Sequence, residues 1–377
     1  MDFLHRTWVE IDLDALSHNF KTVKDNCGNS KIMAVVKANA YGHSVKDIAP
    51  KLDQLGADSF AVSNLVEALQ LREYGITKPI LILGYTPAEN ADILVKNNIA
   101  QTVFSTEFAK KLSRNAVASG VTVKIHLKLD TGMGRLGFDC RNADCAGLTE
   151  AIDALKLPAL EYEGVFTHFS VADGTDTDTR KFTDAQYKRF LNCVEKIEAA
   201  GFKAKYKHCC NSAGSCIHTD KHLDYVRPGI ILYGLTPDKD LKLSQKFLPV
   251  MTFKSVISMV KTINKGDTVS YGRTFNAEKT MKVATVTAGY ADGYPRLLSN
   301  KAEVMVCGKR AKVIGRICMD QFMIDVSHIE NIKEDDEVIL FGKELPVEEL
   351  ATLINTINYE IVCGISPRVP RIISKHK

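Results

Sequence analysis

The 377-residue sequence lacks both kinds of segment that would direct it into or across a membrane. Acidic residues interrupt the opening stretch MDFLHRTWVEIDLD, where a signal peptide needs an unbroken apolar run. No later stretch approaches the roughly 20 uncharged residues of a membrane-spanning helix. We therefore expect a soluble, cytoplasmic protein with no membrane partner.

The sequence also lacks a strong excess of charge of either sign. Its 49 basic and 45 acidic side chains leave a net charge of +4, and no block of Lys and Arg is long enough to follow a phosphate backbone. We therefore expect no nucleic-acid partner. Apolar residues make up 45% of the chain and charged residues 25%, which is ordinary for a soluble globular enzyme and excludes a disordered chain or a coiled coil.

Closely spaced cysteine pairs are missing as well. The ten cysteines are scattered and none forms a C-x-x-C pair, which fits a reducing compartment. The one dense stretch, KHCCNSAGSCIHTDKH, matches no usual zinc spacing. We expect no metal there, and cysteines that pack as small hydrophobes at a buried strand end. The alternative is a soft-metal site made from His208, Cys209, Cys210, Cys216, His218 and His222.

Between residue 31 and about residue 235, short β-branched runs alternate with amphipathic stretches, the pattern of repeated βα units around a parallel sheet. Eight strands are predicted, at residues 31–38, 58–63, 79–84, 100–105, 121–130, 162–170, 203–210 and 225–234. This number favours a closed (β/α)8 barrel. The alternative is a doubly wound open sheet, but it requires a Gly-rich turn after its first strand, and KANAYGHS is not such a turn.

Beyond residue 240 the helical period fades and strand patterns dominate. They predict a mostly-β second domain with strands in residues 251–263, 279–294, 302–317, 322–327 and 337–342, and with a single helix at residues 346–356. We therefore predict an α/β chain with a barrel domain at residues 1–240 and a β-rich domain at residues 241–377. The stretch TWVEIDLD at residues 7–14 predicts a ninth strand, and we expect residues 1–14 to pair with the second domain.

Polar residues follow several barrel strands at their carboxyl ends, where enzymes with this fold build their active sites. They are Lys37, Tyr41, Arg135, His168, Asn211, Ser212, Arg227 and Gly229. Each has a simpler interpretation when taken alone: Lys37 as a solvated surface charge, His168 as a structural histidine, and Asn211 as a helix N-cap. The Asn211–Ser212 segment would also suit an anion, since barrels often hold a phosphate after the seventh and eighth strands.

A series of longer segments resembles the alanine racemase family in the family's own order. These are AVVKANAYGHS, HLKLDTGMGRLGF, THFSVAD, NSAG, VRPGIILYG, VSYGRTF, GYADGYPR, GRICMDQFMID and SPRVPRI, and together they extend over nearly the whole chain. The resemblance implies a pyridoxal 5'-phosphate (PLP) dependent racemase that interconverts L-alanine and D-alanine and supplies D-alanine for cell-wall peptidoglycan. It also implies a homodimer.

The resemblance assigns a role to each matching residue. Lys37 would carry the cofactor and act as one base, and Tyr271 of the partner subunit would act as the second base. The cofactor would be bound by Tyr41, His168, Asn211, Ser212, Arg227, Gly229 and Ile230. Arg135 and the Met319 amide would lie near the substrate carboxylate, Lys128 would match a lysine that is carbamylated in some members, and Tyr290 and Asp320 would narrow the entrance. His168 and Arg227 together would supply the positive charge that favours a tyrosinate.

One residue departs from the family pattern. Many members have a tyrosine after the serine of the segment that matches ISPRVPR, and this chain has Pro367. Proline offers neither a hydroxyl nor a backbone N–H, so a phosphate contact is lost and the pocket wall changes. A serine racemase or a racemase of broader specificity is therefore an alternative. Further alternatives are a PLP-dependent decarboxylase, which would need a Gly-rich phosphate loop, a non-catalytic PLP carrier, and a zinc-binding structural protein.

Overall fold

A computed structural model of the chain describes residues 5–142 and 145–374. The chain divides into two compact units. The barrel unit contains residues 17–40 and 45–247, and the β unit contains the described residues up to Leu16, residues 41–44 and those from Leu248 onward. Within the described ranges, no helix has both the length and the apolar character needed to cross a lipid bilayer.

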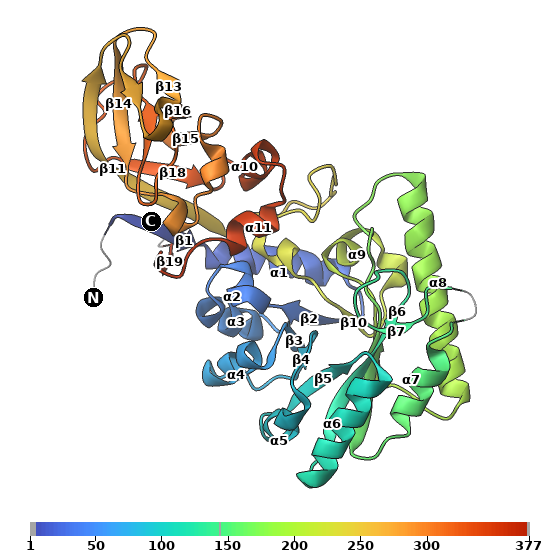
Figure 1. Cartoon of the computed structure of the whole chain (residues 1–377). Helices are drawn as coiled ribbons and strands as arrows, with labels where there is room; N and C mark the ends of the chain where they lie inside the picture. Colours follow the sequence, from blue (N-terminus) through green and yellow to red (C-terminus); the bar gives the residue numbers. More distant parts are fainter. Residues whose placement is uncertain (1–4, 143–144, 375–377) are drawn as a thin grey trace. The chain divides into compact units, whose positions relative to one another are not determined.

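Eight parallel strands form a closed ring in the barrel unit, as predicted (Figure 1). They follow the order β2, β3, β4, β5, β6, β8, β9 and β10, and β10 pairs again with β2. Their bounds are β2 Lys31–Val35, β3 Ser59–Val62, β4 Ile80–Ile82, β5 Ile99–Val103, β6 Val123–Asp130, β8 Leu160–Phe166, β9 Tyr206–His208 and β10 Tyr225–Val226. A short strand β7 (Phe138–Asp139) pairs with β6. Because the strands are parallel, all their carboxyl ends lie at one end of the barrel.

Helices connect the strands and lie around the outside of the barrel (Figure 1). They are α3 Val45–Gln54, α4 Leu65–Glu73, α5 Ala91–Lys96, α6 Thr106–Ala118, α7 Leu148–Leu155, α8 Thr177–Ala199 and α9 Ser212–Ile217, while α1 (Leu13–Asn26) and α2 (Lys37–Tyr41) extend across the division between the units. Side-chain caps fix where several of them begin. Asn64 and Ser105 accept backbone N–H groups of α4 and α6, which satisfies donors that a helix start leaves unpaired.

The barrel strands are all shorter than the sequence predicts, and the last and the first show the effect next to the candidate site. The last ends at Val226, and residues Ile230–Tyr233 form a 3-10 helix instead of continuing the strand. Pro228 accounts for the end of pairing, since it has no N–H to donate to a neighbouring strand. The first strand ends at Val35, so the segment that begins at Lys37 leaves the sheet.

The β unit is built on an eight-stranded sheet with the order β14, β17, β16, β15, β18, β11, β1 and β19. Its strands are β1 Thr7–Ile11, β11 Met251–Ile263, β14 Met281–Val286, β15 Glu303–Val306, β16 Lys309–Ile314, β17 Phe322–Asp325, β18 Glu337–Phe341 and β19 Arg371–Ile373, and β12 Thr268–Val269 pairs separately with β13 Phe275–Asn276. The opening strand β1 pairs antiparallel with β11 and parallel with β19. Between β15 and β16, Cys307 and Gly308 both have positive φ, as a two-residue hairpin turn requires.

The β unit contains two helices where the sequence predicts one. The predicted helix is α10 (Val347–Leu353), which Pro346 precedes. A second helix, α11 (Asn358–Cys363), follows it, so the expectation of a single helix is wrong. Helix α11 has only six residues, and so short a segment shows too few repeats of the 3.6-residue period to be recognised.

Strand β11 shows why the sheet forms. Met251, Phe253, Ser255 and Ile257 are buried at alternate positions, the period-2 pattern of a strand with one face in the core. The ring of Phe253 packs edge to face on Phe341, with centroids 5.6 Å apart.

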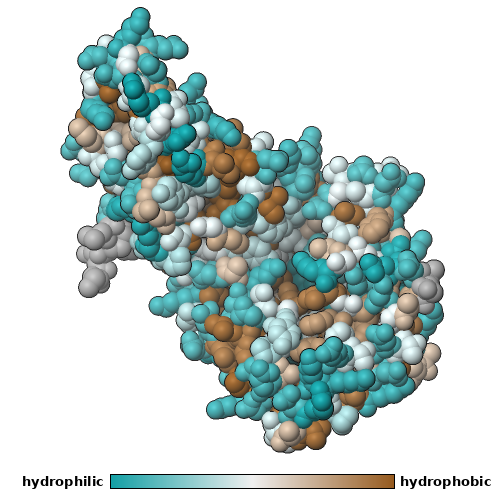
Figure 2. Space-filling model, in the orientation of Figure 1, coloured by the Kyte–Doolittle hydropathy of each residue, from teal (hydrophilic) through white to brown (hydrophobic). Residues whose placement is uncertain are grey.

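Hydrophilic residues predominate over much of the face drawn in Figure 2, with hydrophobic residues in smaller patches among them.

We expect Phe253→Ala to destabilise the β unit by about 3–5 kcal/mol, because it removes a fully buried ring and leaves a cavity. Met259→Ala on the same strand is the control, since Met259 is 48% exposed and its truncation should cost at most about 0.5 kcal/mol. Urea denaturation followed by circular dichroism measures both. Equal midpoints for the two variants would show that Phe253 is not part of the core.

Candidate active site

The residues predicted for the barrel lie at the carboxyl ends of its strands. Lys37 comes two residues after β2, His168 comes two residues after β8, and Arg227 directly follows β10. Lys128 lies near the end of β6, and Arg135 lies in the loop that follows this strand. Strand polarity therefore brings together an amine, an imidazole and guanidinium groups from separate parts of the sequence.

Lys37 opens a left-handed turn. Ala38, Asn39 and Ala40 have φ of 51°, 54° and 54° with ψ near 50°, the left-handed helical region. For an alanine this conformation costs roughly 1–2 kcal/mol, because the Cβ approaches the next carbonyl oxygen. Hydrogen bonds hold the turn: Ala40 N–H donates to Val36 O at 2.9 Å, and Val45 N–H donates to Asn39 Oδ1 at 2.8 Å. The strain marks this segment as a candidate for function.

The charges at this end of the barrel affect one another. Burial lowers the pKa of Lys128 well below its ordinary value, and repulsion by Arg227 and Arg135 lowers it further. Lys37 adds a smaller repulsion, while Asp130 acts in the opposite direction. The Lys128 Nζ also lies 4.4 Å from the centre of the Phe166 ring. The concentration of positive groups favours the neutral amine of Lys128.

Arg227 is the most enclosed of these groups. Only 3% of its surface is exposed, and burial lowers its pKa to about 10, so it remains a cation at neutral pH. Its Nη2 donates to the carbonyl oxygens of Thr167 at 2.8 Å and Cys209 at 3.1 Å. Within the described part of the chain, no carboxylate accepts a hydrogen bond from this guanidinium, and its Nε–H has no protein acceptor. The site therefore contains a buried positive charge with N–H donors to spare.

A chain of buried histidines begins at Arg227, and its polarity can be deduced. Arg227 Nη1 lies 2.8 Å from His208 Nδ1, and since arginine only donates, His208 must accept there and carry its proton on Nε2. His208 Nε2 then donates to His126 Nδ1 at 2.9 Å, and His126 Nε2 donates to Glu163 Oε2 at 3.4 Å. Gly164 makes room for this chain, because a Cβ at that position would lie 2.4 Å from His126 Nδ1.

His168 also accepts from Arg227, whose Nη2 lies 3.3 Å from His168 Nδ1. Burial lowers the pKa of His168 well below its ordinary value, and repulsion by Lys128 and Arg227 adds to the effect. The ring is therefore neutral at neutral pH, with its proton on Nε2. The expectation that His168 and Arg227 share the positive charge needs correction, because the charge lies on Arg227 alone.

Asp130 shapes the loop that carries Arg135. Its Oδ1 accepts the N–H groups of Gly132, Met133 and Gly134 at 2.9–3.1 Å. Gly137 has a φ of 129°, and a Cβ there would lie 2.6 Å from the Asp130 nitrogen, so this position requires glycine. The carboxylate thus folds the loop tightly and leaves Arg135 exposed at its end.

The predicted phosphate-binding residues divide into two groups. Ser212 Oγ accepts the N–H of Gly229 at 2.9 Å, which joins the start of α9 to the segment before Ile230. Asn211 caps α9 through the N–H of Gly214 at 3.0 Å, as its simpler interpretation predicts. Tyr41 belongs to the β unit, where its ring lies 5.9 Å from that of Tyr359.

The remaining predicted residues lie in the β unit around one loop, residues 315–321. This loop contains Met319 and Asp320, and Met319 O accepts the N–H of Ala291, which follows Tyr290, at 3.0 Å. Ser270 Oγ, next to Tyr271, donates to Arg316 O in the same loop at 2.6 Å. Tyr271 is 70% exposed, so its hydroxyl is available to a partner outside the β unit.

A buried carboxylate with two half-exposed arginine partners holds this region of the β unit together. Asp292 is fully buried and accepts from Arg6 at 3.1 Å and from Arg368 at 2.8 Å. Arg368 also donates to Asp320 Oδ1 at 2.7 Å. The structure thus gathers the predicted residues into two groups, one within each unit.

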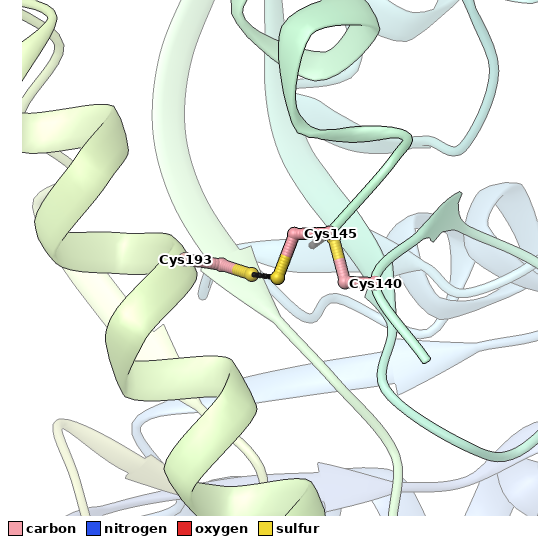
Figure 3. Close-up of side chains that lie close together, drawn as sticks. All are labelled: Cys140, Cys145 and Cys193. Carbon is pink, nitrogen blue, oxygen red and sulfur yellow. Dashed lines mark hydrogen bonds between the residues drawn. The ribbon is translucent and has the colours of Figure 1, made fainter. Parts of the chain in front are cut away.

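The dense Cys/His stretch does not converge on a metal site. His208 is engaged by Arg227, while His218 Nε2 contacts Ala172 O and His222 Nε2 contacts Gly214 O, both at 3.0 Å. A different group of thiols comes together instead, as Figure 3 shows: Cys140, Cys145 and Cys193 lie with all their sulfur atoms within 4.8 Å. Burial raises the pKa of Cys145 to about 11, so this thiol stays protonated and packs as a small hydrophobe.

Sequence reasoning missed several residues of these networks, among them His126, Glu163 and Asp292. His126 had a usable signal, because it lies two residues before Lys128 and alternate residues of a strand share a face. Glu163 had none, since its role depends on which strand pairs with β6. Asp292 lies within the segment GYADGYPR, but nothing there distinguishes it from a solvated turn residue.

Comparison with known proteins identifies the family. Models described as the alanine racemase N-terminal domain and the alanine racemase C-terminal domain match residues 11–237 and 250–373. The alanine racemase of Desulforamulus reducens is 46% identical over 368 residues, which cover 97% of this chain and 98% of that protein. Alanine racemase from Bacillus anthracis with bound L-Ala-P is a similar solved structure, with a TM-score of 0.91, 37% identity, and coverage of 100% of this chain and 96% of that one. Alanine racemase from Clostridium difficile 630 in complex with cycloserine has a TM-score of 0.88 and 38% identity, and the match covers 99% of this chain and 96% of that one. The chain therefore belongs to the alanine racemase family.

Proposed function

We propose that this protein is a PLP-dependent racemase that interconverts L-alanine and D-alanine, with Lys37 and Tyr271 as its two bases. The observation that carries the proposal is the cluster at the barrel's carboxyl end, where Lys37 opens a strained turn among Arg227, His168 and Lys128. The family match extends through the β unit, whereas a cofactor carrier would resemble the barrel alone. By resemblance to its relatives, D-alanine would be used in cell-wall peptidoglycan.

The donor set of the barrel fits PLP. The cofactor has an aldehyde, a pyridine nitrogen and a phosphate, and the barrel offers a group suited to each. Lys37 supplies an amine, Arg227 supplies a buried N–H donor without a carboxylate partner, and the Ser212–Gly229 pair supplies small polar groups next to the start of α9. Tyr41, Asn211 and Ile230 complete the proposed cofactor-binding set.

Racemisation needs two bases, because a proton must leave one face of the α-carbon and another must arrive at the opposite face. When bound, PLP supplies an electron sink that makes the α-proton acidic. Lys37 Nζ would exchange the proton on one face and Tyr271 Oη on the other. Since Tyr271 is 70% exposed within its own chain, we propose that it acts in the site of the partner subunit of a homodimer.

Arg227 and His168 would tune this chemistry. A guanidinium whose pKa is about 10 keeps its proton at neutral pH, so Arg227 would donate a hydrogen bond to the pyridine nitrogen of bound PLP without protonating it. This limits the electron sink and favours rapid return of the proton over side reactions. Neutral His168 would donate from its Nε2–H to the Tyr271 oxygen, with Arg227 supplying the positive charge behind it.

Arg135 and the Met319 amide would bind the substrate carboxylate. The neutral amine of Lys128 is the form that adds carbon dioxide, which supports the carbamate that some members carry at this position. Tyr290 and Asp320 would narrow the entrance, and the hydrogen bond from Arg368 fixes Asp320 for that role.

A second candidate is a serine or broader-specificity racemase with the same mechanism. Pro367 favours it, because this exposed proline replaces a tyrosine that would otherwise narrow the pocket. Its segment is held by the Ser366 N–H, which donates to Asp292 O at 3.1 Å.

The choice between these substrates is tested by chiral amino-acid analysis. Purified, PLP-loaded protein is incubated separately with L-alanine, L-serine and L-lysine. We expect D-alanine to form several-fold faster than either other product. Faster D-serine or D-lysine would change the substrate but keep the mechanism, and absence of any D-product would refute racemisation.

Lys37→Ala should abolish the visible absorbance of covalently bound PLP and lower racemisation by roughly 10³-fold or more, because the cofactor attachment and one base are lost together. Lys31→Ala is a matched control, since Lys31 lies at the other end of the same strand and is exposed. An absorption spectrum with an activity assay measures both. Retention of the chromophore in Lys37→Ala would place the attachment elsewhere.

Tyr271→Phe should lower racemisation by roughly 10²–10⁴-fold in both directions, since the two enantiomers have equal free energy. Exchange of the α-proton with D2O should behave differently. The α-proton exchange should persist for the enantiomer whose α-hydrogen faces Lys37, and it should disappear for the enantiomer whose α-hydrogen faces Tyr271. Proton NMR in D2O follows this exchange, with Tyr74→Phe as the control, and equal mild losses for both enantiomers would refute Tyr271 as the second base.

The shared site gives this variant a further test. Neither Lys37→Ala nor Tyr271→Phe homodimers have a complete site, but a mixed dimer has one site with both native residues. Refolding the two variants together at equal concentration should restore about a quarter of native activity, since half of the random dimers are mixed. No recovery from chains that do form mixed dimers would show that each subunit supplies its own tyrosine.

A further inference from the structure

We infer that Glu67 is a positioning residue for Lys37, and that it acts by holding the left-handed turn in place. This inference rests on the proposed function only in taking Lys37 as the reactive amine. Glu67 lies on α4, in the stretch LVEALQLREYG, where the sequence alone indicates only a helix.

The Glu67 carboxylate bridges the ends of two neighbouring barrel strands. Its Oε1 accepts the N–H of Ala38 at 2.8 Å, directly after Lys37. Its Oε2 accepts the N–H of Ser63 at 2.7 Å, directly after β3. The strands β2 and β3 are paired, so one side chain ties together the backbones that leave them.

The position of Glu67 is itself fixed. Its backbone N–H donates to Asn64 Oδ1, the N-cap of α4, at 3.0 Å. The carboxylate therefore starts from the first turn of a capped helix and reaches back toward the strand ends, a geometry related to the capping box. Helix α4 thus holds the carboxylate in a fixed position, and the carboxylate in turn restrains the segment that carries Lys37.

The turn needs such support. Ala38 has a φ of 51°, and alanine disfavours this region, so without restraint the residue would relax toward the right-handed or extended region. Such a relaxation would rotate the peptide next to Lys37 and redirect its side chain. A charge-assisted hydrogen bond to the Ala38 N–H opposes this rotation at the residue where it would begin.

A carboxylate suits this position better than an amide. Two backbone N–H groups converge on the Glu67 side chain, and a carboxylate can accept both. Glutamine could accept only one, because its NH2 group would face the other donor. The arrangement therefore predicts that kcat falls in steps, from the native enzyme to Glu67→Gln and then to Glu67→Ala.

The experiment compares Glu67→Gln and Glu67→Ala with Glu73→Gln, which removes the same charge from an exposed position on the same helix. Each is measured as PLP-loaded enzyme for kcat and KM, and as cofactor-free protein for amide hydrogen exchange of a peptide covering residues 36–42. We expect Glu67→Ala to lower kcat roughly 10-fold with KM changed less than twofold, since misplacement of a reacting group acts mainly on turnover. Glu67→Gln should lie between it and the native enzyme, and Glu73→Gln should match the native enzyme.

Hydrogen exchange in residues 36–42 should be faster in Glu67→Ala and unchanged in Glu73→Gln. Adding Ala38→Gly to Glu67→Ala should restore most of kcat, because glycine adopts positive φ without steric cost. A purely electrostatic effect of Glu67 on Lys37 would not be restored in this way. Native kcat and native exchange in Glu67→Ala, or no rescue by Ala38→Gly, would overturn the inference.

Lys37→Ala, measured in parallel, separates this inference from the proposed function. Retention of the PLP absorbance in Lys37→Ala would refute Lys37 as the attachment site, whereas the exchange measurement would still report whether Glu67 holds the turn. Loss of the absorbance in Lys37→Ala together with native behaviour of Glu67→Ala would refute the positioning role alone.

Discussion

The buried cation of Arg227 is the constraint on which the rest of the candidate site depends. A guanidinium enclosed at the end of a barrel, without a carboxylate partner among the described residues, must be satisfied by neutral acceptors. It therefore sets which ring nitrogen of His208 and, through His208, of His126 carries the proton. Burial lowers the pKa of His168 and of Lys128, and repulsion by Arg227 lowers both further. The series of hydrogen bonds that begins at Arg227 reaches its first carboxylate at Glu163, which accepts from His126.

This arrangement suits a proton-exchanging site better than an ion pair would. A carboxylate next to Arg227 would neutralise it and remove the field that acts on an amine, a phenol or a cofactor ring nearby. Neutral histidines instead hold the guanidinium in a fixed orientation and leave its charge available. Burying this charge costs free energy, and the stability of the barrel offsets that cost. The closed ring of paired strands fixes the strand ends from which these groups extend.

The fold and much of the site could be predicted from the sequence, for reasons visible in particular elements. The barrel was predictable because short β-branched runs alternate with amphipathic stretches along the chain, and Lys37, His168 and Arg227 because they lie at the carboxyl ends of the strands. The left-handed turn was not, since KANAY contains two alanines and no glycine to indicate positive φ. Glu163 and Glu67 were also hidden, because their partners lie on elements that only the closed barrel brings next to them. Helix α11 was too short to show its period.

The central claim is that burial and the charge of Arg227 together keep His208 and His168 neutral, and that hydrogen bonds from Arg227 place their protons on Nε2. Nitrogen NMR of protein labelled with 15N-histidine, followed from about pH 5 to pH 9, tests this most directly. The account predicts that His208 and His168 show neutral rings with protonated Nε2 throughout, because their pKa values lie well below the ordinary value. As the pH falls below about 6.5, the folded protein should lose stability, since these histidines gain protons only on unfolding. Titration of either ring near its ordinary pKa, or a neutral ring with its proton on Nδ1, would contradict the account.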